Sequence, residues 1–150
     1  MAASDHSSGH CELCELCEVD GGEVLFQNDD YRVVLVDDTA YPGFCRVIWQ
    51  KHVKEMTMLS PAQRNVLMDG VWRVEAALLE IMQPAKVNLA SLGNMTQHLH
   101  WHLIPRFNDD AHFPNPIWGE AKRSPSAAVM AERSALLPQL RKAVVRHLAQ

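Results

Sequence analysis

Three histidines, His98, His100 and His102, occupy every second position between Gln97 and Arg106. The residues between them are bulky and apolar, a period-2 alternation typical of a β-strand. On a strand the imidazoles share one face, each roughly 6.6 Å from the next, while the apolar side chains face a core. On a helix, residues two apart point in nearly opposite directions, so the imidazoles would not converge.

An imidazole row of this kind suits two kinds of chemistry. Neutral imidazoles can bind a metal ion, or one imidazole can act as a nucleophile while its neighbours orient it and handle protons. The alternative is that the histidines have no function and merely occupy a half-exposed polar strand face. The strict alternation of three histidines makes this alternative weaker than a functional role. The chemistry alone does not rank the three histidines.

The motif resembles that of the histidine-triad (HIT) family of nucleotide hydrolases and transferases, His-φ-His-φ-His-φ-φ with φ apolar. All seven positions are filled, by His98-Leu99-His100-Trp101-His102-Leu103-Ile104. The resemblance covers approximately residues 11–118. It implies that His100 is the nucleophile and forms a nucleotidyl-histidine, that His102 meets the α-phosphate or leaving group, and that His98 orients the site or binds metal.

The same resemblance implies four substrate-binding residues. Asn88, about ten residues before the triad, corresponds to a phosphate-site asparagine, and Asp37 stands where relatives bind the ribose hydroxyls. Relatives carry Gly-Gln-Ser/Thr just before the triad. In this chain the corresponding segment is 93–97, and its alignment with that pattern is one residue short. There Asn94 could replace the glutamine, and Thr96 shares the face of the triad if the strand begins early. The alternative for each residue is an ordinary polar side chain of a turn, edge or loop.

Three of the four cysteines are closely spaced, as Cys11-x-x-Cys14-x-x-Cys17. Without an export signal, such a cluster predicts metal binding or redox chemistry before structural disulfides. Cys11 and Cys14 form one possible pair and Cys14 and Cys17 the other. The alternative is that these cysteines are free thiols near the N-terminus and form no metal or redox site.

Several branches of the family pair an N-terminal Cys-x-x-Cys with two histidines, which implies a structural zinc site in this chain. Two thiolates and two imidazoles make an ordinary tetrahedral zinc set, here Cys14, Cys17, His52 and His98. The zinc would tie the N-terminal segment to the sheet and fix the strand that carries His100, without being the catalyst. No organic cofactor is expected.

The composition is that of one globular, soluble domain, with 150 residues, 47% hydrophobic and 21% charged. A formal net charge of −4 argues against nonspecific nucleic-acid binding, and no apolar run approaches the roughly 20 residues of a membrane span. Residues 1–10 are small and polar, without the apolar stretch of a secretory signal. We therefore expect a flexible tail at 1–10, a single domain at 11–150, and a cytoplasmic location.

The pattern also predicts the elements that must position these residues. Runs rich in β-branched and apolar residues predict strands at 24–27, 31–36, 44–49 and 86–92, besides the triad strand. Ser60, Pro61 and Gln63 signal a helix start, and apolar spacing predicts a helix over 61–82 that ends before Pro84.

The C-terminal part is predicted to be helical from Ser126 to Leu148, with a break or kink at Pro138. Between the triad and this helix, prolines around His112 predict an irregular segment, for which a structural role is favoured. Together the elements predict an α+β fold with a mainly antiparallel sheet of about five strands, one long helix and a C-terminal helix. The resemblance implies the same HIT-like fold, often as a homodimer.

The leading hypothesis is an enzyme that cleaves nucleotides at the α-phosphate through His100. The resemblance implies dinucleoside polyphosphates, as for a bacterial diadenosine tetraphosphate hydrolase, nucleoside phosphoramidates or adenylyl sulfate as substrates. One alternative is a metal-dependent hydrolase that uses the histidine row as ligands, with Asp109 and Asp110 as the nearest carboxylates. The other is a nucleotide-binding module with little turnover.

Overall fold

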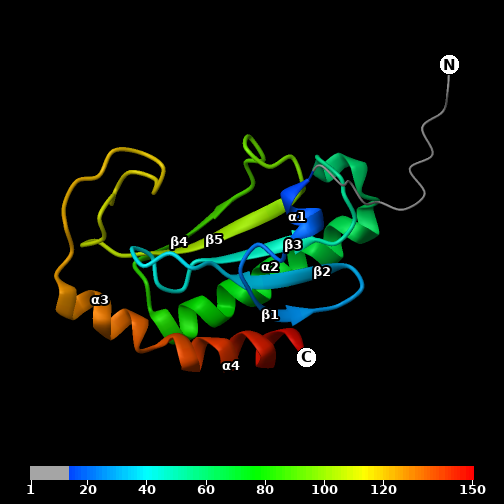
Figure 1. Cartoon of the computed structure of the whole chain (residues 1–150). Helices are drawn as coiled ribbons and strands as arrows, with labels where there is room; N and C mark the ends of the chain where they lie inside the picture. The colour runs from blue at the N-terminus through cyan, green and yellow to red at the C-terminus, as the bar shows by residue number, and fades with distance from the viewer. Residues whose placement is uncertain (1–13) are drawn as a thin grey trace, which may run out of the picture.

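A single antiparallel sheet forms the centre of the computed structural model, which describes residues 14–150 (Figure 1). Its strand order is β1-β2-β3-β5-β4. The strands are β1 (Glu23–Gln27), β2 (Tyr31–Leu35), β3 (Cys45–Trp49), β4 (Lys86–Ala90) and β5 (His100–Arg106). The predicted α+β architecture with a mainly antiparallel sheet is confirmed, whereas the predicted tail at 1–10 and Cys11 lie outside the described residues.

The long helix α2 (Pro61–Met82) has the predicted bounds. Its start is a capping box, in which the Ser60 hydroxyl accepts from the Gln63 backbone N–H and the Gln63 side chain accepts from the Ser60 N–H. Its last turn is followed by Gln83 in the left-handed conformation, ahead of Pro84. No helix among residues 14–150 is long and apolar enough to span a membrane.

The C-terminal region forms two helices, α3 (Ala127–Ser134) and α4 (Leu137–Leu148). The break precedes Pro138, which lies in the first turn of α4, where its missing N–H removes no hydrogen bond. The expected break is therefore confirmed as a new helix start. Two short elements were not predicted, α1 (Glu15–Glu18) and the 3₁₀ turn η1 (Met56–Met58).

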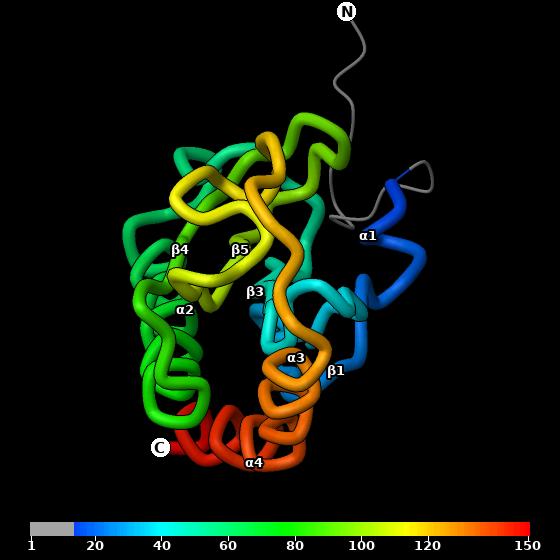
Figure 2. Tube along the Cα trace, turned by 90° about the vertical axis from the view of Figure 1, so that its left-hand side faces the viewer, coloured from blue at the N-terminus to red at the C-terminus, as the bar shows by residue number. Residues whose placement is uncertain are grey.

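The two faces of the sheet differ in chemistry. Helices α2 and α4 cover one face and enclose the main core with apolar residues of the strands, among them Val33, Val47, Trp101 and Leu103. On the opposite face Leu16 of α1 packs against Val34 and Ile48. The chain after β5 loops beside β4 and β5 before it runs to α3 (Figure 2).

The triad strand begins later than predicted. Regular pairing of β5 with β3 ends at His100 opposite Ile48, and His98 lies at a bend before the strand. The reason is that the two backbone groups of Leu99 have partners in different segments. Its carbonyl accepts from the Trp49 N–H at the end of β3, and its N–H donates to the Val53 carbonyl beyond β3. The prediction of one strand face carrying all three histidines is therefore wrong for His98.

A buried ion pair organises the segment after β5. Arg106 and Asp110 are each 2% exposed and joined by two hydrogen bonds, of 2.8 and 3.1 Å. Burial by itself would raise the pKa of the Asp110 carboxyl, but the bonds from Arg106 and from three backbone N–H groups, those of Phe107, His112 and Phe113, hold it well below its usual range. Arg106 also donates to the Asn115 carbonyl, so this pair fixes the path of the loop.

Replacing Asp110 by alanine should therefore lower the free energy of unfolding by about 3–5 kcal/mol, because it leaves the Arg106 charge buried without its partner. The stabilisation by Asp110 should be complete above the pKa of an unfolded aspartate, about 3.9, and decline as the pH falls below it. Urea unfolding at pH 7 and at pH 3 measures both effects.

The matched control is Asp109→Ala, because the Asp109 side chain is 55% exposed and pairs with Arg133 at the surface. It should cost less than about 1 kcal/mol. Equal losses in the two variants would contradict the role given to the Arg106–Asp110 pair.

Candidate functional site

His100 and His102 lie on the face of the sheet opposite α2, as period-2 alternation requires, and Trp101 and Leu103 lie in the core. Arg46 of β3 pairs with His102 in the strand register, so its side chain emerges on the same face. The two imidazoles meet edge to face, with ring centroids 4.8 Å apart. The sheet thus places two histidines and one arginine side by side.

The tautomer of His100 is set by a backbone carbonyl. Its Nδ1 lies 2.6 Å from the carbonyl oxygen of His98, which can only accept, so Nδ1 carries the hydrogen. In a neutral imidazole Nε2 then keeps a free lone pair. Burial lowers the pKa of His100, and the charge of Arg46 lowers it further. His100 is therefore neutral, with an unprotonated Nε2.

His102 has the opposite tautomer. Its Nδ1 lies 3.4 Å from Nε of Arg46, which can only donate, so the hydrogen of the neutral ring is on Nε2. Burial, then the neighbouring His100 and Arg46, lower the pKa of His102 to about 3. The pair therefore offers one nitrogen that can attack and one N–H that can donate a hydrogen bond.

Both histidines line a cleft of about 600 Å³. Phe44 and Trp118 flank His102, with ring centroids 5.6 and 5.1 Å from it. Large apolar side chains with more than half of their surface exposed form part of its rim, namely Leu92, Met95 and Trp118. The cleft therefore combines a polar floor with an apolar and aromatic rim.

The four predicted substrate-binding residues divide between this cleft and other places. Asn94 and Thr96 line the cleft. The Oδ1 atom of Asn88 accepts from Nη1 of Arg106 at 2.8 Å, and Asn88 does not line the cleft. Asp37 lines a separate cleft of about 380 Å³ beside α3 and α4. The structure thus brings Asn94 and Thr96, and neither Asn88 nor Asp37, into the cleft of the two histidines.

Arg46 and Trp118 are among the residues of the cleft that sequence reasoning missed. The signal for Arg46 was a single charge in the otherwise apolar strand 44–49, at a position that alternates with the core residues Cys45 and Val47. Trp118 ends a proline-rich segment whose path depends on the distant Arg106–Asp110 pair. No local pattern could place it.

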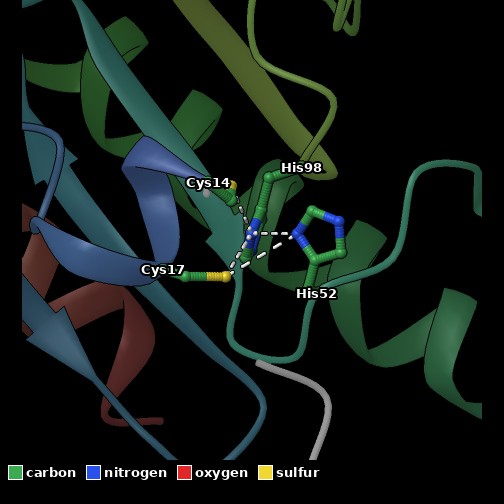
Figure 3. Close-up of side chains that lie close together, drawn as sticks. All are labelled: Cys14, Cys17, His52 and His98. Atoms are coloured by element: carbon green, nitrogen blue, oxygen red, sulfur yellow. Dashed lines mark hydrogen bonds between the residues drawn. The ribbon is translucent and has the colours of Figure 1, made fainter. Parts of the chain in front are cut away.

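A second group of side chains lies at the end of the sheet where β5 begins. Cys14 precedes α1 and Cys17 lies within it, His52 follows β3, and His98 precedes β5 (Figure 3). Their ligand atoms all lie within 4.8 Å of one another. The structure thus brings together the four residues predicted to bind metal.

Four of the distances within this cluster match those around a tetrahedral metal ion. Zinc–sulfur and zinc–nitrogen bonds of about 2.3 and 2.05 Å at tetrahedral angles place sulfur about 3.6 Å and nitrogen about 3.3 Å from a neighbouring nitrogen. Nδ1 of His98 lies 3.5 Å from both sulfur atoms and 3.3 Å from Nδ1 of His52, and Sγ of Cys17 lies 3.6 Å from Nδ1 of His52. These four residues could hold a zinc ion.

A hydrogen bond to a backbone carbonyl also sets the tautomer of His98 that can bind a metal ion. Its Nε2 donates to the Trp49 carbonyl at 2.6 Å, so in the neutral ring Nδ1 is unprotonated and faces both sulfur atoms. Burial lowers the pKa of His98, which favours this neutral form. Such an outer hydrogen bond is typical of a metal-binding histidine.

The triad lies within the region that a protein-family model matches. The family model described as the HIT domain matches residues 19–109. The chain belongs to the HIT domain family. Proteins of this family generally bind nucleotides, and many hydrolyse them. No curated protein sequence matches this HIT protein.

Solved structures show the same fold. A histidine triad protein from Bradyrhizobium japonicum is 27% identical, with a TM-score of 0.70 over 89% of this chain and 97% of that one. A histidine triad protein from Marinobacter aquaeolei is 28% identical, with a TM-score of 0.62 over 81% and 92%. A zinc-bound histidine triad family protein from Mycobacterium smegmatis is 16% identical, with a TM-score of 0.57 over 83% and 85%, and shares the fold.

Proposed function

We propose that this HIT protein cleaves nucleotides at the α-phosphate through a nucleotidyl intermediate on His100. The observation that carries the proposal is the 2.6 Å contact between Nδ1 of His100 and the His98 carbonyl, which leaves Nε2 free to attack. Dinucleoside polyphosphates such as diadenosine tetraphosphate, nucleoside phosphoramidates and adenylyl sulfate are the proposed substrates, because each carries a leaving group on an α-phosphate.

In the first step Nε2 of His100 forms a bond to the α-phosphorus, and the bond from phosphorus to the leaving group breaks. A phosphate leaving group departs as an anion, whereas an amine takes a proton from solvent. The ring of His100 becomes positive, and its Nδ1–H bond to the His98 carbonyl strengthens as that charge develops. The Nε2–H of His102 donates to a phosphoryl oxygen.

In the second step water attacks the same phosphorus. The phosphorus–nitrogen bond breaks and returns its electron pair to Nε2, while the proton of the attacking water leaves to solvent. His100 is thereby restored to its neutral form with the hydrogen still on Nδ1. Trp118 and the apolar rim are proposed to contact the nucleotide or its leaving group, together with Asn94 and Thr96 at the mouth.

The competing hypothesis, a catalytic metal bound by the histidine row, has less support. His98 is turned toward the two cysteines rather than toward His100 and His102. Asp110 is buried against Arg106 and Asp109 pairs with Arg133. Neither carboxylate therefore completes a metal site with the triad.

We also propose that the cluster of Cys14, Cys17, His52 and His98 binds a structural zinc ion. The support is the tetrahedral spacing of its atoms and the zinc-bound relative from Mycobacterium smegmatis. The ion would join α1 to the segments that follow β3 and precede β5. It would therefore fix the His98 carbonyl that orients His100.

Finally, we propose that two copies assemble as a homodimer through α2 and the edge strand β4. In the part of the chain described, β4 pairs on one side only, and an unpaired edge invites pairing with another chain. Helix α2, which packs against β4, exposes 57% of Trp72 and 49% of Leu79. A cytoplasmic location stays a prediction.

Replacing His100 by alanine should reduce AMP release from diadenosine tetraphosphate and from an adenosine phosphoramidate by about 10⁴-fold or more, because the attacking atom is lost. His147→Ala is the matched control, since His147 lies on α4 against Glu80, away from the cleft. Acid-free quenching and intact mass should detect a nucleotidyl adduct on wild type and none on His100→Ala. Undiminished release by His100→Ala would overturn the covalent mechanism.

Protein purified without chelator should contain one zinc ion per chain, and Cys17→Ser should lose it and unfold at a lower temperature. Cys11→Ser is the matched control and should keep its zinc. Elemental analysis and thermal unfolding measure both. Absence of stoichiometric zinc from wild type would refute the proposal, and loss from Cys11→Ser alone would assign the site to the Cys11–Cys14 pair.

Replacing Trp72 by glutamate should convert the dimer to monomers, because a charge would be buried at the proposed interface. Val145→Glu is the control, since Val145 is also exposed, at 45%, but lies on α4. Sedimentation velocity at micromolar concentration measures the change. A monomeric wild type, or equal effects of the two substitutions, would show that this face is no dimer interface.

A further inference from the structure

Arg46 is the one arginine or lysine among the described residues that line the cleft. His100 and His102 share that cleft with Arg46. The described lining has one carboxylate, that of Glu15, which would repel an anion. Arg46 is therefore the one side chain of the described lining whose fixed positive charge can meet a bound phosphate.

The guanidinium of Arg46 is held by two contacts. Its Nε donates to Nδ1 of His102 at 3.4 Å, and its Nη1 donates to the Gly21 carbonyl at 3.3 Å. Gly21 has a φ of 84°, and a Cβ there would lie 2.8 Å from a methyl carbon of Leu16. Only glycine therefore lets this turn pass so close to α1 while presenting its carbonyl to Arg46.

The remaining nitrogen, Nη2, has no hydrogen-bond partner within residues 14–150. The guanidinium also lies 5.5 Å from the centre of the Phe44 ring, which limits its hydration on that side. A cation that is partly removed from water and fixed in orientation interacts more strongly with an anion than a solvated one does. Arg46 thus has an unused donor beside the nucleophile, and within residues 14–150 the Glu15 carboxylate acts on its charge without forming a salt bridge.

We propose that Arg46 binds the phosphate of the substrate and, through its contact with Nδ1, keeps the donor hydrogen of His102 on Nε2. This inference rests on the proposed function for its reaction, but its binding part can be measured without turnover. A fixed charge and a fixed donor then act on the same phosphoryl group from one face of the sheet. Since a guanidinium stays charged, phosphate binding does not depend on protonated histidine.

The experiment measures the binding of AMP by calorimetry to wild type, Arg46→Met and Arg46→Lys. The matched control is Arg146→Met, which changes the net charge equally but removes an exposed arginine paired with Glu80 on α4. Zinc content and thermal unfolding establish that each variant is folded. Adenosine, which lacks the phosphate, serves as the neutral probe.

Arg46→Met should weaken AMP binding about ten- to hundredfold and leave adenosine binding unchanged, because a charged hydrogen bond to phosphate is lost. Arg146→Met should bind AMP as wild type does. Arg46→Lys should retain most of the affinity for AMP but lose turnover, because lysine keeps the charge and lacks the Nε–H that faces His102.

Equal AMP affinity of wild type and Arg46→Met would overturn the proposal, as would an equal loss of adenosine binding. Failure of wild type to bind AMP would also overturn it. AMP binding that depends on Arg46, in a protein that releases no AMP from any substrate offered, would support the phosphate site and reject the hydrolase proposal. If Arg46→Met fails to fold, full affinity and turnover in Arg46→Lys would overturn the role of the Nε contact.

Discussion

The position of His98 is the constraint on which both sites depend. Its ring is held by the Trp49 carbonyl and turned toward Cys14 and Cys17, while its own carbonyl accepts the Nδ1 hydrogen of His100. A displacement of His98 would therefore alter the metal cluster and the tautomer of His100 together. The bend before β5 makes this possible, because a regular strand would place the carbonyl and the ring of His98 differently relative to His100.

The charge distribution of the cleft follows from the same layered sheet. Burial on one face keeps His100 and His102 neutral, and this neutrality suits a nucleophile that attacks without prior deprotonation. Arginine is not neutralised under these conditions. Arg46 lies opposite His102 in the strand register, so a fixed cation stands beside the two neutral imidazoles. The imidazoles and the cation can therefore play different roles in the cleft.

The features that the sequence predicted well are those with local causes. Ser60, Pro61 and Gln63 set the start of α2 through contacts within four residues, and its bounds agree with the structure. Alternation in β5 likewise predicted which side chains face the core. The contacts that sequence could not predict join distant segments: Leu99 bonds to Trp49 and Val53, which moves His98 out of the strand, and Asn88 is engaged by Arg106.

The Arg106–Asp110 pair shows how such distant contacts reach the cleft. It lies at the far end of β5 from His100, yet it holds the loop whose tryptophan, Trp118, packs edge to face against His102. A buried pair is a costly way to stabilise a loop, since each charge must be removed from water. Its value here is geometric, because six hydrogen bonds to the Asp110 carboxylate fix one loop path: two from Arg106, three from backbone N–H groups and one from the Tyr41 hydroxyl. That path places the Trp118 ring beside the neutral His102. The strand therefore determines the cleft at both of its ends, through a carbonyl at His98 and an ion pair at Arg106.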